Sequence, residues 1–372
     1  MNILVVNWQD RTNPQAGGAE VHFHEIFSRI ARRGHRVTLC CSAYRGSLHR
    51  ETIDGIEIIR RGSRAFFNFR FPFTWFASLR SRPFDCVVED LNKLPLFTPL
   101  YVRRPLAGIG HHLFGRSIFL ETGPLVARYV YWMERAALAL YRTRIPFMVV
   151  SPSTREEFIA HGFPAARLAV IHNCVDHARY TAVGAPKSPD PLIGCFGRLK
   201  KYKSVDHLLR ALPLVRERVP AVRAVIAGEG DDRPRLEAIA ASLGLGTAVQ
   251  FAGYVAEEQK IVLLQSMWCK VATSSKEGWG LTVIEANACG TPAIASDVPG
   301  LRDSVRDNET GLLYPYGDVE ALARRIILLL EDAALRRRLS EGAVAWAKQF
   351  DWETAADRTI EFLERARSNP AF

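Results

Sequence analysis

The sequence lacks any long apolar run, and no stretch approaches the roughly 20 residues that a helix needs to cross a membrane. Its opening, MNILVVNWQD, has no basic segment before the short apolar run and no small-residue cleavage site after it. We therefore expect a first strand rather than an export signal. Low-complexity tracts and fixed-period repeats are also missing, so the sequence predicts a globular protein of the cytoplasm.

Cysteine is scarce and scattered. The seven cysteines are odd in number, and none stands in a C-x-x-C pair that would suggest zinc or redox chemistry. This pattern favours buried thiols in a reducing compartment over a disulfide framework.

The length of the chain predicts two domains, because 372 residues exceed the roughly 250 to 300 at which a single core stops growing. Strands such as ILVVNW and FDCVVED alternate with helical patterns in the first half, and LIGCFGRL begins a second alternation. Between them, AVGAPKSPDP (182–191) holds three prolines and is the predicted linker. We expect an α/β fold with two doubly wound parallel-sheet domains, 1–183 and 184–350. A helix in 351–372 either completes the second domain or crosses back to the first.

Positive charge is concentrated in the first half. Residues 1–185 contain 24 Lys and Arg against 14 Asp and Glu, whereas residues 186–372 contain 25 of each. The first half therefore carries the whole excess of +10 and should attract an anionic partner. No nucleic-acid-binding module is recognisable, so an acidic membrane or a phosphate-bearing substrate is expected instead of nucleic acid.

Residues 60–82 interleave aromatic and basic side chains. Such a segment suits an interfacial patch that enters an anionic leaflet, which would place the protein peripherally at the inner face of the plasma membrane. Alternatively, several rings belong to the core and the arginines merely face water. The aromatic residues are Phe66, Phe67, Phe69, Phe71, Phe73, Trp75 and Phe76, and six arginines accompany them.

Two cations follow the first strand of the second half. The sequence GRLKKYKS places Arg198 and Lys203 in the loop after Gly197. A forked guanidinium and a compact ammonium at the carboxyl end of a strand suit a diphosphate. A solvated turn is the simpler alternative.

The stretch EGWGLTVIE (277–285) has a carboxylate at each end. Gly278 and Gly280 allow close approach of a ligand. Leu281 or Thr282 then opens a helix whose free N–H groups suit a phosphate. Glu285 would then lie about one turn inside the helix, near a ribose, while Glu277 stays in the loop near the sugar ring. Ordinary loop and helix glutamates are the alternative.

In the first half, PQAGGAEVHFHE places Gly17 and Gly18 in the turn between the first strand and its helix. The G-x-G-x-x-G fingerprint is absent and no acidic residue ends the second strand, so the sequence gives little support for NAD. His111 and His112 end the strand LAGIGHH, where polar side chains can face a ligand. A structural histidine is the alternative.

These motifs together resemble the retaining glycosyltransferases of family 4, which have the GT-B arrangement of two facing Rossmann-like domains with a central cleft. The resemblance covers nearly the whole chain. Its segments are GGAE, GHRVTL, HHLFG, SPSTREE, IHNCVD, GRLKKYK, EGWGLTVIEANACGTPAIAS and TGLLYPYGD.

The resemblance implies roles for individual residues. Arg198 and Lys203 would hold the donor diphosphate, Glu277 the transferred sugar, and Glu285 the ribose. In the first domain, Gly18, beside Gly17, would lie near the phosphates and His111 near the reacting sugar. Two positions depart from the family, which commonly has glycine where this chain has Cys174 and Ser204.

The implied activity is transfer of a hexose from a nucleotide-diphosphate sugar to a glycan or lipid-linked acceptor, with retention of configuration, in polysaccharide or glycolipid synthesis. We expect no cofactor and no metal, because fixed cations can stabilise the departing diphosphate. The adjacent Asp231 and Asp232 are expected to begin a surface helix. The alternatives are a non-catalytic protein that binds sugar nucleotides or lipid surfaces, and a GT-B-like sugar-nucleotide epimerase.

Overall fold

The structure is a computed structural model that describes residues 1–92, 94–184 and 186–369. It divides into two compact units, of which the first comprises Met1–Asn173 with the C-terminal helix and the second Cys174–Asp351. The chain therefore passes to the second unit at residues 173–174, ahead of the linker expected at 182–191. Residue 185 of that linker and residues 370–372 of the C-terminal segment lie outside the described residues.

The first unit is built on an eight-stranded sheet of order β3-β4-β2-β1-β5-β6-β7-β8. Neighbouring strands are parallel except β3 with β4, which are antiparallel. The strands are β1 (Asn2–Val6), β2 (Arg36–Ala43), β3 (Arg50–Ile53), β4 (Ile56–Ser63), β5 (Cys86–Leu91), β6 (Leu106–Gly110), β7 (Phe147–Val149) and β8 (Leu168–Val170).

Helices cover this sheet because each has one apolar face. In α1 the buried side chains Phe23, Ile26, Phe27 and Ile30 recur at helical spacing. The helices are α1 (Gly18–Arg32), α2 (Phe67–Thr74), α3 (Pro124–Tyr141), α4 (Pro152–Ala160) and α12 (Trp352–Ser368). Short helical turns are η1 (Arg64–Phe66), η2 (Trp75–Leu79), η3 (Thr98–Leu100), η4 (Gly115–Leu120) and η5 (Ala165–Arg167).

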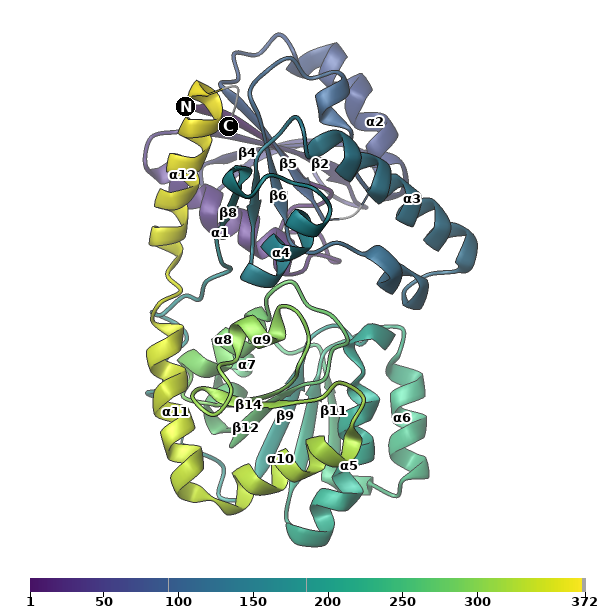
Figure 1. Ribbon diagram of the computed structural model, residues 1–372, viewed down its shortest axis with the longest axis vertical. Helices are drawn as coiled ribbons and strands as arrows, with labels where there is room; N and C mark the ends of the chain where they lie inside the picture. The colour runs from purple at the N-terminus through teal and green to yellow at the C-terminus, as the bar shows by residue number, and fades with distance from the viewer. Residues whose placement is uncertain (93, 185, 370–372) are drawn as a thin grey trace. The chain divides into compact units, whose positions relative to one another are not determined.

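The C-terminal helix α12 packs on α1 of the first unit, which answers the question that the sequence left open (Figure 1). Arg29 Nε donates to Glu353 Oε1 at 2.8 Å, and Arg33 Nη1 donates to Asp357 Oδ1 at 2.6 Å. The side chain of Phe362 is buried on the inner face of α12. The first unit is therefore assembled from two distant parts of the sequence.

The segment 60–82 contains both core rings and exposed rings, the two alternatives that the sequence left open. Phe67, Phe71 and Trp75 are buried in the core. The rings on the other face of the same helical segment, which we call the Phe stripe, are 53% to 70% exposed. The Phe stripe consists of Phe66, Phe69, Phe73 and Phe76.

The alternative in which all six arginines of this segment face water is wrong for one of them, Arg60. Its side chain is fully buried, and its Nε donates to Asp10 Oδ2 at 2.6 Å. Arg60 also pairs with Glu51. A buried guanidinium needs a carboxylate partner. Because the partners of Arg60 lie far away in the sequence, the local pattern of rings and arginines could not reveal that this arginine is buried.

The second unit has a six-stranded parallel sheet of order β11-β10-β9-β12-β13-β14. Its strands are β9 (Leu192–Phe196), β10 (Arg223–Ala227), β11 (Val249–Gly253), β12 (Cys269–Ala272), β13 (Ala293–Ser296) and β14 (Gly311–Tyr314). The helices are α5 (Val205–Arg218), α6 (Arg233–Ser242), α7 (Glu257–Ser266), α8 (Leu281–Ala288), α9 (Leu301–Ser304), α10 (Val319–Glu331) and α11 (Ala333–Ala347), with short turns η6 (Lys201–Lys203) and η7 (Gly246–Ala248).

The prediction of two parallel-sheet α/β domains is confirmed. All seven cysteines are buried, as expected. Asp232 immediately precedes α6, so the aspartate pair does begin a helix. Among the described residues no helix is both long and apolar enough to span a bilayer.

Candidate functional site

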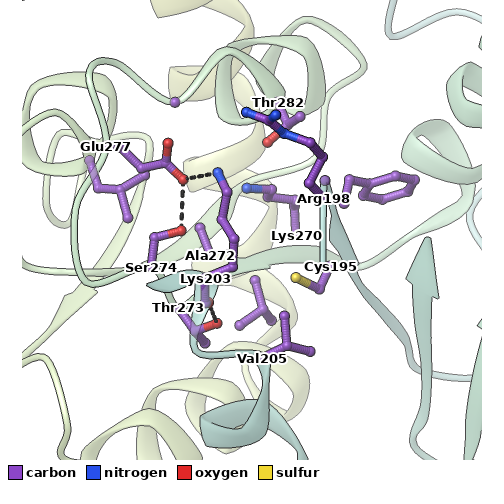
Figure 2. A pocket seen from close by; sticks show the side chains of 15 residues that line it. Cys195, Arg198, Lys203, Val205, Lys270, Ala272, Thr273, Ser274, Glu277 and Thr282 are labelled. Atoms are coloured by element: carbon purple, nitrogen blue, oxygen red, sulfur yellow. Dashed lines mark hydrogen bonds and ion pairs between the residues drawn. The ribbon is translucent and has the colours of Figure 1, made fainter. Parts of the chain in front are cut away.

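A pocket opens in the second unit at the carboxyl ends of β9 and β12 (Figure 2). These two strands are neighbours in the sheet, and β9 is the first strand of this unit, so the strand order reverses at this point. Such a switch point is where open parallel sheets bind ligands. Gly197 and Arg198 line the pocket after β9, and Thr273 and Ser274 line it after β12.

The pocket contains an ion pair between Lys203 and Glu277. Glu277 Oε1 also accepts a hydrogen bond from Ser274 Oγ at 2.7 Å. Burial alone would raise the pKa of Glu277, but the ammonium of Lys203 and the hydroxyl of Ser274 hold it below its ordinary value. The side chains of Lys203 and Glu277 are 21% and 20% exposed, so both charges remain within reach of a ligand.

The loop that carries Lys203 is fixed to the loop that carries Glu277. Thr273 Oγ1 donates to the carbonyl oxygen of Lys203 at 2.8 Å, and Ser275 N donates to the carbonyl oxygen of Tyr202 at 2.7 Å. Ser204, which follows Lys203, has φ 48° and ψ 39°, in the left-handed region that favours glycine. Ser204 therefore adopts the left-handed backbone conformation that glycine would adopt with less strain.

Helix α8 begins at Leu281, as the sequence predicts, and Gly280 precedes it with φ 99°. A Cβ atom at Gly280 would lie 2.9 Å from Ser304 Oγ, so both its conformation and its surroundings favour glycine. Gly280 and Thr282 line the pocket, which places the first turn of α8 beside Arg198. Unpaired N–H groups of a helix N-terminus attract anions.

Glu285 lies inside α8 as predicted, but it already has a partner. Lys260 Nζ is 2.7 Å from Glu285 Oε2, and the same ammonium lies 5.3 Å from the ring centre of Tyr180. Glu285 is 6% exposed and is not among the residues that line the pocket. Its contact with a ribose stays a prediction, and such a contact would have to share the carboxylate with Lys260.

In the first unit, His111 lies directly after β6, with its Nε2 3.1 Å from Asp90 Oδ1. Asp90 also accepts a hydrogen bond from Asn7 Nδ2 at 3.0 Å. The ring of His22 on α1 packs edge-on against His111, with 5.0 Å between ring centres. Burial, together with His111, lowers the pKa of His22 well below its ordinary value.

The glycine pair also lies where the sequence predicts, at the start of α1. Gly17 precedes the helix, Gly18 is its first residue, and Gly17 N donates to Glu20 Oε2 at 2.7 Å. The helix end is therefore partly capped by its own carboxylate. Roles for these glycines and for His111 in ligand binding stay predictions.

The structure brings six of the predicted residues together in one pocket, while Leu281 and Glu285 lie on the helix beside it. Gly17, Gly18 and His111 belong to the first unit. The six are Gly197, Arg198, Lys203, Glu277, Gly280 and Thr282.

Sequence reasoning missed Lys270, which lies inside β12 and lines the same pocket. Its residue is 3% exposed, and burial lowers the pKa of its amine to about 8. The available signal was a lysine in the middle of the apolar run WCKVA. Because charged residues are rarely fully buried, such an interruption marks a position to inspect.

Among residues 1–92, 94–184 and 186–369, no group of three or more His, Cys, Asp or Glu side chains is placed to hold a metal ion. Asp231 Oδ2 is instead 2.8 Å from Lys200 Nζ, and Asp232 binds Arg235. The structure thus shows both aspartates in ion pairs.

Comparison with curated proteins finds glycosyltransferases. The chain is 34% identical over 233 residues to D-inositol 3-phosphate glycosyltransferase of Streptomyces bingchenggensis, which covers 57% of this chain and 50% of that protein. It is 27% identical over 397 residues to glycogen synthase of Mycobacterium tuberculosis, covering 99% of this chain and 95% of that protein. The chain thus spans about half the length of the first relative and nearly all of the second.

Solved structures share the fold. Sucrose-phosphate synthase from Thermosynechococcus elongatus superimposes with a TM-score of 0.80 at 20% identity, covering 98% of this chain and 99% of that chain. Anabaena Alr3699/HepE in complex with UDP-glucose gives a TM-score of 0.78 at 22% identity, over 98% and 99% of the chains. At these identities the likeness establishes the fold alone.

Family models account for both units. The model for Glycosyltransferase Family 4 matches residues 16–179, and the model for Glycosyl transferases group 1 matches residues 178–346. The second match includes every residue of the pocket, and the two matches meet close to the boundary between the units. The chain therefore belongs to the glycosyltransferases of family 4 and group 1, which have the GT-B fold, and it is an enzyme of that class.

Proposed function

We propose that the protein transfers a hexose from a nucleotide-diphosphate sugar to a glycan or lipid-linked sugar acceptor, with retention of configuration and without a metal ion. The single observation that carries this proposal is the pocket of the second unit, where Arg198, Lys203 and the first turn of α8 converge. Two cations and a helix N-terminus are a set of groups suited to a diphosphate.

The reaction breaks the bond between the sugar C1 and the β-phosphate oxygen, and forms a bond from C1 to the acceptor oxygen. Negative charge develops on the departing diphosphate, and fixed cations stabilise it in the transition state. The β-phosphate takes the proton of the acceptor hydroxyl on the same face of the sugar. Glu277, held as a carboxylate by Lys203, is available to bind a hydroxyl of the transferred sugar.

The donor is identified by thermal stabilisation with UDP-, GDP- and ADP-sugars, because a ligand that binds only the folded state raises its stability. UDP-glucose comes first in the screen because the similar HepE structure holds it. Incubation of the bound sugar nucleotide with and without glycan or lipid-linked acceptors then distinguishes transfer from epimerisation, since an epimerase converts the donor without any acceptor.

The decisive variant is Lys203→Met, compared with Lys200→Met as the matched control. Both remove an amine from the same loop, but Lys200 pairs with Asp231 and does not line the pocket. We expect Lys203→Met to lower kcat/KM by roughly 100- to 1000-fold, as removal of one fixed stabilising group does, and Lys200→Met to change it little. Equal losses in both variants would overturn the assignment of the diphosphate to this pocket.

The acceptor is proposed to be lipid-linked because the first unit exposes apolar and basic side chains together. The Phe stripe lies beside the exposed arginines Arg64, Arg70 and Arg80. A face of exposed rings with cations at its edge suits the boundary between lipid headgroups and acyl chains.

A second exposed apolar face on α3 supports the same proposal. We call it the α3 face; its residues Leu125, Val126, Tyr129 and Trp132 are 41% to 79% exposed. Exposed arginines again accompany it, at positions 116, 128 and 135. Charge complementarity therefore favours an anionic lipid bilayer as the surface that both faces meet.

A further inference from the structure

Lys270 is placed where an apolar side chain would be expected. It lies within β12, in register with Gly194 of β9 and Ala293 of β13, and the whole strand is buried. Its neighbours Cys269 and Val271 belong to the main core of the unit, so Lys270 projects from the opposite face of the sheet. There it joins the lining of the pocket, with its amine turned toward Lys203 (Figure 2).

The amine of Lys270 makes no hydrogen bond or ion pair with any residue that the structure describes. Two nearby lysines do have carboxylate partners, since Lys203 pairs with Glu277 and Lys260 with Glu285. Lys187 Nζ donates to the Met267 carbonyl at 2.7 Å. Because the residue is only 3% exposed, its amine has little access to water, and its place in the pocket lining points to a ligand that completes its bonds.

The charges of the pocket are out of balance for a diphosphate unless Lys270 is charged. Arg198 and Lys203 bring two positive charges, and Glu277 cancels one of them. Each phosphate of a nucleotide-diphosphate sugar carries a negative charge, so a third cation is needed to match both. Protonated Lys270 supplies it.

We propose that Lys270 is a third cation of the donor site and that its protonated amine binds a diphosphate oxygen when a nucleoside diphosphate enters the pocket. The inference rests on the proposed function of this pocket. It adds Lys270, in its protonated form, to the residues that bind the diphosphate. The charged and titratable groups that act on Lys270 are Lys203 from the loop after β9, Cys195 at the end of β9, Glu277 from the loop after β12, and Glu285 of α8. Arg198 lines the same pocket.

The expected direction of the protonation follows from these groups. Burial lowers the pKa of Lys270 to about 8, and Lys203 acts in the same direction, while Glu277 and Glu285 oppose them. A bound diphosphate adds negative charge and therefore raises the pKa of the amine. Near pH 8 to 9, a part of the empty protein must then bind a proton from the buffer when the ligand enters.

The test is isothermal titration of the full chain with UDP, GDP and ADP at pH 8.5, each in two buffers that differ in ionisation enthalpy. The dependence of the observed heat on the buffer gives the number of protons taken up. The terminal phosphate of each nucleotide, with a pKa of about 6, is already ionised at this pH, so uptake belongs to the protein. We expect the wild-type protein to take up a proton with at least one of the three nucleotides.

Two variants assign the proton. Lys270→Arg keeps the charge but does not titrate here, so it should bind the nucleotide without proton uptake and with affinity that varies little between pH 7 and 9. Lys270→Met should take up no proton and bind roughly 10- to 100-fold more weakly at pH 7, as loss of a charged hydrogen bond does. Circular dichroism checks that each variant folds.

The control is Lys187→Met. The pKa of Lys187 is also lowered to about 8 by burial, but its amine lies outside the pocket lining. Proton uptake should survive in this variant. Binding without proton uptake by the wild-type protein, or uptake that persists in Lys270→Arg, would overturn the inference and leave the proposed function standing. Failure of the wild-type protein to bind any of the three nucleotides would overturn the proposed function, and this inference with it.

Discussion

The charged side chains of the pocket differ in whether they have an ion-pair partner. Lys203 and Glu277 keep each other charged, whereas Lys270 is buried beside them without a partner among the described residues. A charge that is paired in the empty protein is held in place for the ligand. A charge that is unpaired lowers the stability of the empty protein and is compensated only when the ligand binds.

We predict that Glu277→Gln lowers the rate of transfer by roughly 100-fold with little loss of stability, because the residue keeps its size and hydrogen bonds but loses its charge. Steady-state kinetics with the donor found in the screen, together with thermal unfolding, measure both effects. A variant that fails to fold would show instead that Glu277 has a structural role.

We predict that Lys270→Met stabilises the ligand-free protein at pH 7. The amine has a pKa of about 8 in the folded protein and ~10.4 in the unfolded chain. Between these values the unfolded chain binds more protons, so the contribution of Lys270 to stability rises with pH.

The variant should therefore be more stable than the wild type by about 1 to 3 kcal/mol at pH 7, with a difference that shrinks as the pH rises from 8 toward 10. Urea denaturation at several pH values measures it. A constant difference over this range would mean that packing, and not the proton, accounts for the gain.

The sequence could locate much of the pocket at this scale. Arg198, Lys203 and Glu277 directly follow recognisable strands, and the carboxyl ends of parallel strands meet at one edge of a sheet. The sequence could not locate Lys270, because whether a lysine in a strand faces solvent or a pocket depends on the helices that cover the sheet. It also could not show that Lys260 pairs with Glu285, since Lys260 comes from another helix.

At the scale of elements, the junction between η6 and α5 decides how Lys203 is presented. Ser204 occupies a left-handed conformation, and its hydroxyl lies 2.9 Å from that of Tyr316. This contact offsets part of the unfavourable backbone conformation. At the other departure from the family, Cys174 is buried and is not among the described non-glycine residues with positive φ, so glycine is not required there.

We predict that Ser204→Gly changes the free energy of unfolding by less than about 1 kcal/mol, because relief of the backbone and loss of the contact oppose each other. Ser204→Val should lower it by about 2 kcal/mol or more, since a branched side chain fits this conformation poorly. Chemical denaturation compares the two. Similar values for both would indicate that the loop adopts another shape in solution.

The junction of α12 with α1 gives a second prediction at this scale. Phe362 is buried, so Phe362→Ala should cost about 3 to 5 kcal/mol in the first unit. The side chain of Glu353 is 55% exposed, so Glu353→Ala should cost less than about 1 kcal/mol despite its ion pairs.

Hydrogen exchange reads out this prediction locally. Amides of α1 should exchange faster in Phe362→Ala and hardly change in Glu353→Ala, while amides of β9 and β12 in the second unit serve as the internal control. Equal acceleration in both units by Phe362→Ala would show that the two units unfold together.

Most regular elements were predictable because apolar runs and helical periodicity are strong in this chain. Four strands, β3, β4, β8 and β14, do not stand out in the sequence. Two of these, β8 and β14, are only three and four residues long, and β3 and β4 contain charged residues that obscure the strand pattern. In each case pairing with a neighbouring strand, and not local propensity, decides the conformation.

At the scale of the whole molecule, the uneven charge of the sequence and the exposed rings lie in the same unit. The Phe stripe and the α3 face both belong to the first unit, whose residues carry the excess of arginine. Sequence alone left open which rings are buried, because both faces of the helical segment 64–79 are aromatic. Only the packing of Phe67, Phe71 and Trp75 into the core separates the two sets.

We predict that the protein floats with liposomes that contain anionic lipid and not with neutral ones, and that binding weakens as salt rises, because ions screen exposed charges beyond ~8 Å at physiological ionic strength. The double variant Phe69→Ser, Phe73→Ser should reduce flotation without unfolding the protein. Tyr254→Ser is the matched control, since Tyr254 is an 82% exposed aromatic residue of the second unit. Equal recovery with both kinds of liposome would contradict the electrostatic part of the proposal.

The path of the chain through the two units has a consequence for its synthesis. The ends of the second unit meet, since Val175 N donates to the carbonyl oxygen of Phe350 at 3.2 Å. That unit can close on itself as soon as its last residues leave the ribosome. The first unit is begun earlier but finished later, because α12 is translated after the whole of the second unit. Until then the surface of α1 that α12 covers stays open to other chains, and chaperones would be needed most at that stage.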